Sequence, residues 1–182
     1  MSRRPSAGED EPVVIVEYDL RWPAMFADEA ARIAIALPGH LLGIEHIGST
    51  TVEGLAAKPV IDIQVGVRSL QPTGELVGAM AEIGYLYFPE MEADLPDRRY
   101  FRRGEGRRTH QVHMVERTNA AWWDRHVIFR DWLRTHPADA FAYAKLKRRL
   151  AKDHRGDRTG YTEAKSEFIA QVVEQARAST PI

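Results

Sequence analysis

One short segment, residues 59–67, constrains the fold of this chain more than any other. It reads Pro-Val-Ile-Asp-Ile-Gln-Val-Gly-Val, so branched apolar residues alternate with other types. Side chains of a strand point alternately to opposite faces, and this spacing predicts a strand with one apolar face. The other face carries Val60, Asp62 and Gln64. A carboxylate on such a strand is costly to bury unless it is paired, hydrogen-bonded or bound to a metal. Asp62 is therefore a candidate site residue, and the simpler alternative is that it faces solvent or pairs with an arginine.

A glycine-hydroxyl turn comes shortly before this strand. Residues 41–47 predict a strand of their own, which ends at Gly48-Ser49-Thr50. Gly48 lets backbone N–H groups approach an anion closely, and the hydroxyl groups of Ser49 and Thr50 add hydrogen-bond partners for a phosphate. The alternative is a plain tight turn in which Ser49 or Thr50 caps the helical turn that follows. A turn of this kind beside Asp62 favours a phosphate and its metal between the two strands.

The rest of the chain predicts helices and strands in one clear order. Amphipathic helices are expected at residues 22–37, 74–83, 120–135, 137–154 and 162–178. Strands are expected at residues 41–47, 59–67, 85–88, 99–103 and 107–116, and residues 13–16 form either a strand or an extended lead-in. This order predicts an α+β fold, with helices on one side of a sheet and a C-terminal helical subregion.

Length and composition limit the possible domain organisation. With 182 residues the chain is long enough for one domain with a full core, and we expect that domain at residues 13–182 behind a disordered tail at residues 1–12. Its sheet core would span about residues 13–117 and its helical part about residues 119–178. The absence of cysteine excludes disulfides and thiolate metal sites.

Charge and hydropathy indicate which partners to expect. The 25 Lys and Arg residues nearly balance the 26 Asp and Glu residues, so net charge does not favour a nucleic-acid partner. No stretch of the sequence is apolar enough for a membrane span, and the first residues lack the apolar centre of a signal peptide. We therefore expect a cytoplasmic protein that binds a nucleotide and a small-molecule or protein acceptor, without a membrane or nucleic-acid partner.

Four further side chains are candidates for binding or catalysis. His113 can accept a proton, touch a phosphate or bind a metal together with Asp62, and His46 lies next to the Gly-Ser turn; for each, an ordinary hydrogen-bonded histidine is the alternative. Lys58 can meet a phosphate or be a surface lysine. Arg99 belongs to an arginine-rich hairpin whose charges either bind a substrate anion or offset the acidic loop before it.

Two tyrosine–lysine pairs in the C-terminal region share a helix face, and they either line a pocket or decorate the surface. The pairs are Tyr143 with Lys147 and Tyr161 with Lys165. Aromatic residues recur at helical spacing in the helix at residues 120–135, and we expect them to build core rather than to bind a cofactor. They are Trp122, Trp123, Phe129 and Trp132.

These segments together resemble the signature of the GrpB family. The resemblance is carried by residues 45–51, 54–59 and 61–63, with further matches at Tyr18, Trp22 and residues 98–101, 108–110, 113, 129–150 and 161–169. GrpB proteins are similar to the polymerase-β-like nucleotidyltransferase superfamily, which implies a mixed sheet, a Gly-Ser turn that holds a triphosphate, and acids on the next strands that bind magnesium. On this resemblance Gly48 and Ser49 occupy the phosphate turn, and Asp62 occupies the position of the first metal-binding acid. Gln64 departs from the second acid.

The resulting prediction is a magnesium-dependent nucleotidyltransferase that moves a nucleoside monophosphate from a nucleoside triphosphate to a small-molecule or protein acceptor. Its phosphate-binding residues would be Gly48, Ser49, Thr50 and Arg99. Its metal ligands would be Asp62 and Gln64, and its catalytic residues Asp62, His113 and Lys58. Gln64 offers only a neutral carbonyl, which weakens metal binding. The alternative is a non-catalytic module that binds a nucleotide or another anionic metabolite with a degenerate metal site.

Overall fold

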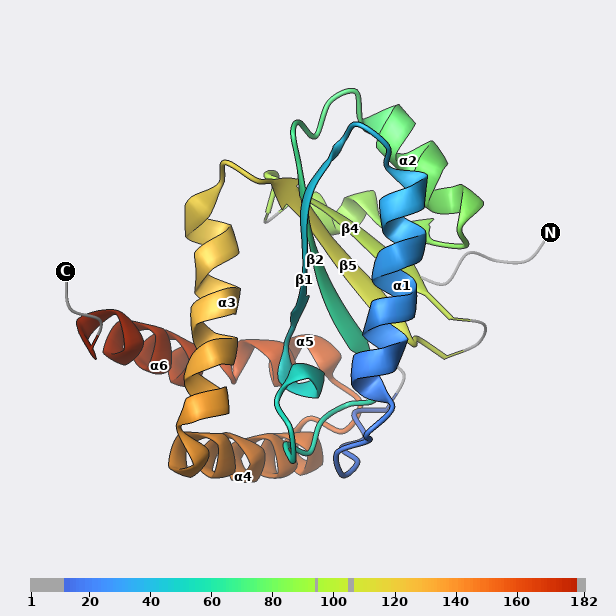
Figure 1. Ribbon diagram of the computed structural model, residues 1–182. Coiled ribbons are helices and arrows are strands. Elements are labelled where there is room, and N and C mark those ends of the chain that lie inside the picture. Colours follow the sequence, from blue (N-terminus) through green and yellow to red (C-terminus); the bar gives the residue numbers. More distant parts are fainter. Residues whose placement is uncertain (1–11, 94, 105–106, 180–182) are drawn as a thin grey trace.

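A five-stranded mixed sheet forms the centre of the protein (Figure 1). The computed structural model describes residues 12–93, 95–104 and 107–179. The strands are β1 (Leu41–Ile47), β2 (Ile61–Val67), β3 (Leu86–Tyr87), β4 (Arg98–Arg103) and β5 (His110–Glu116). Their order is β1-β2-β5-β4-β3, in which β2 and β5 are parallel and the other neighbours are antiparallel. The predicted α+β fold with a mixed sheet is therefore confirmed.

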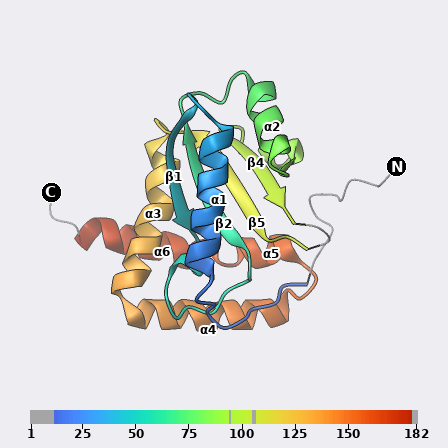
Figure 2. The same ribbon diagram turned by 45° about the vertical axis from the view of Figure 1, so that its right-hand side comes forward.

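Helices cover both faces of the sheet, whereas the sequence predicted helices on one side. The helices are α1 (Trp22–Ala36), α2 (Thr73–Glu82), α3 (Ala120–Thr135), α4 (Pro137–Asp153), α5 (Arg158–Glu163) and α6 (Ser166–Ser179). Short 3-10 turns follow β1 at η1 (Ser49–Thr51) and β3 at η2 (Pro89–Glu92). Figures 1 and 2 show α1 and α2 on one face, α3 and α6 on the other, and α4 below one end of the sheet. No helix of the described residues is both long and apolar enough to cross a membrane.

Two local predictions also differ from the structure. The helix predicted at residues 162–178 is divided into α5 and α6, because the chain leaves the helical path between Glu163 and Ser166. The segment at residues 13–16 forms no regular strand; Val16 makes a single antiparallel bridge to Ala57. The tail predicted at residues 1–12 lies outside the described residues except for Pro12.

The first face of β2 supplies the main hydrophobic core. Ile61, Ile63 and Val65 are fully buried there and pack with Ile33 of α1 and Met80 of α2. Each fully buried aliphatic side chain of this size contributes about 1.5–3 kcal/mol of transfer free energy relative to exposure. The alternation in the sequence therefore fixes which face of β2 points toward α1 and α2, and it leaves Asp62 on the opposite face.

Helix α3 packs against the second face of the sheet at a point where two neighbouring strands both carry glycine. Gly43 of β1 and Gly66 of β2 are paired in register, and the Trp123 ring of α3 packs over both glycines. A Cβ atom on Gly66 would lie 2.7 Å from Cζ3 of Trp123 and 2.9 Å from Cδ of Arg117. The two glycines thus let α3 approach the sheet closely at this end of β1 and β2.

We predict that Gly66→Ala destabilises the protein by about 1–3 kcal/mol, because the added methyl group overlaps the buried Trp123 ring. Urea unfolding followed by circular dichroism measures this change. The matched control is Gly78→Ala on the exposed side of α2, where a Cβ meets nothing within 4 Å. That substitution is expected to stabilise the protein by about 0.5–1 kcal/mol through helix propensity. Equal effects of the two substitutions would contradict this account of the α3 contact.

Candidate functional site

A cavity of about 350 Å³ lies between the second face of the sheet and the C-terminal helices. We call it the main cavity. The η1 turn, the first part of β2, the middle of β5 and helices α3 to α6 all contribute to its wall. Its polar side chains are those of Ser49, Thr50, Lys58, Asp62, Gln111, His113, Arg125, His126, Tyr143, Lys147, Tyr161, Thr162 and Lys165. Its size lies within the range typical of small-ligand sites.

The Gly-Ser turn forms one end of the main cavity. Gly48 adopts φ +74° and ψ −172°, which is a conformation reserved for glycine, and a Cβ atom there would lie 2.5 Å from Oδ2 of Asp62. The turn therefore lies directly against the carboxylate, as the sequence predicted. Neither hydroxyl side chain caps η1. The Thr50 hydroxyl instead contacts Nε2 of His46 at 2.9 Å, and Ser49 hydrogen-bonds the Tyr143 side chain.

Asp62 is the only carboxylate among the described residues that line the main cavity. Its side chain is 25 % exposed, and the exposed part faces the cavity. Gln111 is its register partner on the parallel strand β5, and the Gln111 amide donates a hydrogen bond to Oδ1. Burial raises the pKa of Asp62, while this hydrogen bond and the nearby Lys58 and Lys165 oppose the rise.

Two lysine ammonium groups lie over one aromatic ring in the cavity wall. Lys58 Nζ is 5.0 Å from the centre of the Tyr161 ring, and Lys165 Nζ is 4.4 Å from it. Such contacts stabilise a cation that has lost part of its hydration. The tyrosine therefore holds both ammonium groups next to the space that a ligand would fill.

Lys147 brings a third ammonium group to the cavity from α4. Only 2 % of its surface is exposed. Its Nζ donates a hydrogen bond to the Ala56 carbonyl at 2.5 Å and lies 4.8 Å from the centre of the Tyr143 ring. The carbonyl satisfies one of the three donors of this ammonium group. Lys147 is nevertheless one of the residues that line the main cavity.

Burial and neighbouring cations disfavour the charge of the three lysines, and Asp62 opposes this effect at each of them. Burial lowers the pKa of Lys58 to about 7, with Lys165 and Arg158 as further causes. Burial and the neighbouring Lys165 likewise lower the pKa of Lys147 to about 7, and burial lowers that of Lys165 to about 8. An anion between them would restore their charge. The arrangement is that of a site that concentrates positive charge around one carboxylate.

The two histidines of the cavity present different nitrogen atoms to it. Arg98 donates to Nδ1 of His113 at 3.0 Å, so the proton of the neutral ring is on Nε2, which lies 4.0 Å from Oδ1 of Asp62. This separation is longer than a hydrogen bond, and in this tautomer His113 presents an N–H group toward Asp62. The general-base role predicted from the sequence stays a prediction. In His126 the other ring nitrogen carries the proton. Its Nδ1 donates to the Trp122 carbonyl at 3.0 Å, which leaves a lone pair on Nε2. Burial lowers the pKa of both histidines.

Three residues proposed from the sequence lie elsewhere. Gln64 shares the face of Asp62 but is fully buried under α3, where its amide donates to the Trp123 carbonyl at 3.2 Å. Arg99 lies on the opposite face of the sheet, where it pairs with Glu92 at 3.1 Å and bonds Thr73. His46 also points to that face. The predicted metal role of Gln64 and phosphate role of Arg99 are therefore not supported by the positions of these side chains.

His46 has a structural environment. Its ring is stacked on Phe26 of α1 with 4.6 Å between the centroids, and burial lowers its pKa to about 4. A histidine held neutral between the sheet and α1 has no access to the main cavity, which its side chain does not line. The structure therefore supports the alternative stated for His46, an ordinary hydrogen-bonded histidine.

The residues of the cavity do not fit the predicted magnesium site. Magnesium in nucleotide sites is held by carboxylates together with phosphate oxygens and waters. Among the described residues no group of three His, Asp or Glu side chains could hold a metal ion. The positions next to Asp62 on the sheet carry glutamines, namely Gln64 two residues along β2 and Gln111 across on β5. The surrounding lysines add positive charge where a dication would have to enter.

Sequence reasoning missed two features of the site. His126 was not considered, although its spacing from Trp122 and Phe129 places all three on one face of α3. Trp122 was expected to build core, yet it lines the cavity with its ring centroid 4.8 Å from that of His126. The periodicity marks this face of α3 as apolar, but it does not show that part of the face remains uncovered.

We predict that stability rises between pH 7 and pH 9.5. The three lysines have folded pKa values of about 7, 7 and 8 against an ordinary value of 10.5. The unfolded chain therefore binds more protons in this interval, and its relative free energy increases with pH. Thermal unfolding at low ionic strength across this interval measures the effect.

The variant Lys165→Met should flatten this dependence and raise the melting temperature at pH 7. Lys152→Met, at an exposed position near the end of α4, is the matched control and should leave the slope unchanged. A slope that is the same in both variants, or a loss of stability from pH 7 to pH 9.5, would show that the lysine cluster is not strained by charge.

Comparison with known proteins identifies relatives of this chain. The family model described as GrpB protein matches residues 12–175. A UPF0157 protein of Pseudomonas aeruginosa is 41% identical over 189 residues, which cover 98% of this chain and 73% of that protein. The UPF0157 protein YqkA of Bacillus subtilis is 39% identical over 165 residues, which cover 91% of this chain and 47% of YqkA. The chain thus spans about half the length of YqkA.

Two further relatives bear on the fold and on possible activities. The crystal structure of the conserved protein GrpB from Enterococcus faecalis superposes with a TM-score of 0.81 at 38% identity, over 90% of this chain and 96% of that one. A protein of Mycolicibacterium paratuberculosis named dephospho-CoA kinase is 30% identical over 187 residues, which cover 91% of this chain but only 46% of that protein. From the family match and these relatives, the chain belongs to the GrpB protein family.

Proposed function

We propose that the main cavity binds a phosphorylated metabolite, with nucleotides as the leading class, and that lysine side chains rather than a metal ion recognise the phosphate. The observation that carries this proposal is the charge of the cavity: three lysines, Lys58, Lys147 and Lys165, surround the single carboxylate of Asp62. A cluster of buried positive charges attracts an anion strongly, because little water screens the charges.

The remaining wall of the cavity supports a nucleotide rather than a bare phosphate. Trp122, Phe129 and Tyr161 supply aromatic surface on which a base can stack. The N–H group of His113 and the hydroxyl groups at the η1 turn can position a sugar or a phosphate. The relative named dephospho-CoA kinase agrees with an activity related to nucleotides, although this chain matches less than half of it.

The transferase reaction implied by the family resemblance is not part of the proposal. That reaction relies on magnesium held by acids, and here the neighbours of Asp62 are glutamines. A binding module that recognises its ligand through Lys58, Lys147 and Lys165 needs no such ion. Substitution of Asp62 separates the two possibilities, since it has opposite consequences in them.

We predict that adenosine monophosphate binds the wild-type protein without magnesium, and that Lys165→Gln weakens this binding about 10- to 100-fold through loss of one charged hydrogen bond. Asp62→Asn should strengthen it about 3- to 10-fold, because the change removes a negative charge beside the phosphate. Isothermal titration calorimetry at pH 7, with and without magnesium chloride, measures both effects. Lys152→Gln, at an exposed site on α4, is the control for a lost surface charge.

Two results would overturn the proposal. One is the absence of binding by adenosine monophosphate and other nucleoside phosphates at every magnesium concentration. The other is binding that requires magnesium and disappears in Asp62→Asn, since an acid that repels the ligand cannot be needed for its binding. The second result would instead favour the metal-dependent transferase.

A further inference from the structure

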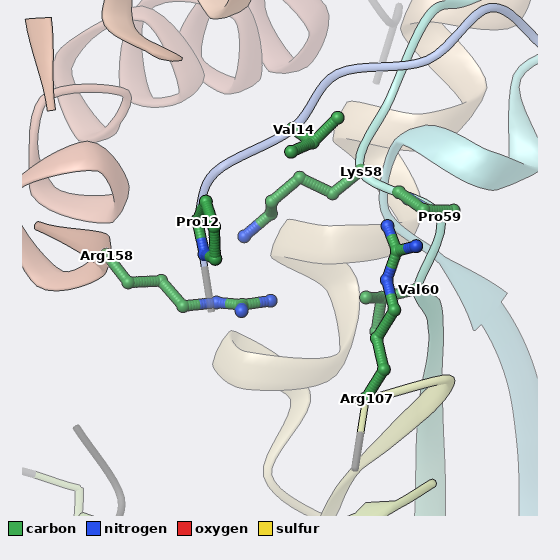
Figure 3. A pocket seen from close by; sticks show the side chains of 7 residues that line it. All are labelled: Pro12, Val14, Lys58, Pro59, Val60, Arg107 and Arg158. Carbon is green, nitrogen blue, oxygen red and sulfur yellow. The ribbon is translucent and has the colours of Figure 1, made fainter. Parts of the chain in front are cut away.

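Lys58 lines two spaces at once. One is the main cavity, and the other is a hollow of about 410 Å³ that we call the outer hollow (Figure 3). Figure 3 shows the Lys58 side chain extending into this hollow from the segment before β2. The apolar part of the wall consists of Pro12, Val14, Pro59 and Val60. A small ligand therefore reaches the Lys58 amino group from either space, and apolar surface replaces part of the water that surrounds an exposed lysine.

The described surroundings of Lys58 favour a neutral amine over an ammonium ion. An ammonium group carries three N–H donors. Among the described residues, none accepts a hydrogen bond from Lys58 Nζ, and its contact with Tyr161 is with the face of the ring, 5.0 Å from the centroid. Lys147 differs, because its Nζ donates to the Ala56 carbonyl at 2.5 Å. A neutral amine has a lone pair, which makes Lys58 a candidate nucleophile.

The charges around Lys58 favour the same state. Burial lowers its pKa to about 7, and Lys165 is the neighbouring charge that contributes most to this shift. At Lys165 burial also has the largest effect and lowers the pKa to about 8, but the largest charge effect there is that of Asp62, which opposes the shift. Lys165 is thus the cation of the pair and Lys58 the amine. A lysine beside another cation in a desolvated site is activated toward carbonyl compounds. The other charged groups that face Lys58 are Asp62 of β2, Arg107 and Arg108 before β5, and Arg158 of α5.

We propose that Lys58 is a covalent site, at which its amino group forms an imine with a small aldehyde. The nitrogen lone pair attacks the carbonyl carbon, and a proton passes from nitrogen to the carbonyl oxygen, which gives a carbinolamine. An acid then protonates the hydroxyl group, water leaves, and the nitrogen lone pair completes the C=N bond. One amine, one aldehyde and one proton thus give a protonated imine and one water molecule, without an oxidant or a reductant.

Asp62 is placed to act as the acid and to stabilise the product. It carries the only carboxyl group among the described residues that line the main cavity, and burial raises its pKa. After it has given up its proton, the carboxylate stabilises a cation at Lys58, since its charge favours the protonated form of that nitrogen. Imine formation goes beyond the proposed function. The proposed function enters at one point, because a phosphate group on the aldehyde would also be held by Lys165.

The test traps the imine by reduction on the full chain. The protein is incubated at pH 7 with glycolaldehyde phosphate or glycolaldehyde and with sodium cyanoborohydride, which reduces an imine to a stable secondary amine. Mass spectrometry of peptides then locates the label. At pH 7 about half of Lys58 is neutral, against roughly one in a thousand or less for a lysine of ordinary pKa, so its labelling should be about tenfold or more faster than that of the exposed Lys152.

Three variants test the chemistry. Lys58→Arg keeps a side chain of similar length without a nucleophilic amine and should abolish the fast labelling. Lys152→Arg, at the exposed position on α4, is the matched control and should leave it unchanged. The rate of labelling of Lys58 should level off with a midpoint near pH 7 in the wild type. Lys165→Met removes the neighbouring cation, so it should move this midpoint to higher pH, a change that a purely structural role of Lys165 would not produce.

The inference is overturned if wild-type Lys58 is labelled no faster than Lys152, if another lysine of the cavity carries the label instead, or if fast labelling persists in Lys58→Arg. An unchanged midpoint in Lys165→Met would contradict the activation by a neighbouring cation.

Comparison of the two aldehydes at pH 8.5, above the pKa of Lys58, separates this inference from the proposed function. Labelling that is about tenfold faster with the phosphorylated aldehyde supports both, because bound phosphate raises the local concentration of the carbonyl group. Fast labelling at equal rates supports the imine and contradicts a phosphate site in the cavity. Binding of adenosine monophosphate without fast labelling of Lys58 overturns the imine and leaves the proposed function standing.

Discussion

The burial of both faces of β2 is the constraint on which the rest of the structure depends. One face presents only branched aliphatic side chains and is sealed by α1 and α2. The other face begins with Asp62, continues with the fully buried Gln64 and ends with Gly66 under Trp123. The packing against α3 is thus closest at the end of β2 that bears Gly66. At the beginning of the strand the helices stand off from the sheet, and the main cavity fills the space around Asp62.

The position of the Gly-Ser turn follows from the same strand pair. Ile47 and Asp62 are register partners, so the chain leaves β1 just where the carboxylate emerges from β2. Only a residue without a side chain fits between them, because a Cβ on Gly48 would overlap the carboxylate oxygen. The turn, the acid and the cavity are therefore one local arrangement. The lysines are contributed by α4, by the turn between α5 and α6, and by the segment before β2.

Local patterns in the sequence predicted local structure well. Strand β1 and helix α3 have the bounds that hydrophobic periodicity indicates. The start of α3 is capped by Asn119, whose side chain accepts a hydrogen bond from the Trp122 N–H group. Periodicity could not show that the C-terminal helices fold back over the second face, since that depends on contacts between distant residues. The predicted one-sided sheet was wrong for this reason, and so was the position of Arg99, whose face in β4 depends on the register with β5.

The candidate site was predictable in part, for a related reason. Gly48, Ser49 and Asp62 are close in sequence, and the turn between their strands brings them together. The pairs Tyr143 with Lys147 and Tyr161 with Lys165 were recognised as pairs, but only the packing of α4 and α5 shows that both line the cavity. Nothing in the sequence marked His126 as a site residue apart from its place on an apolar helix face. The prediction of Gln64 as a ligand assumed that every residue on the face of Asp62 reaches the site.

The pairing of β2 with β5 also bears on the chemistry, because it places Gln111 beside Asp62. The Gln111 amide donates to the carboxylate, and its carbonyl oxygen accepts from Tyr100 at 2.7 Å. The Gln111 side-chain amide is thus oriented by Asp62 and Tyr100, and Asp62 receives a neutral donor where an acid on β5 would repel it. One carboxylate beside an amide donor faces three lysines, so positive charge exceeds negative charge around the cavity when the lysines are protonated. This excess is the physical basis on which we propose a negatively charged ligand rather than a metal-centred site.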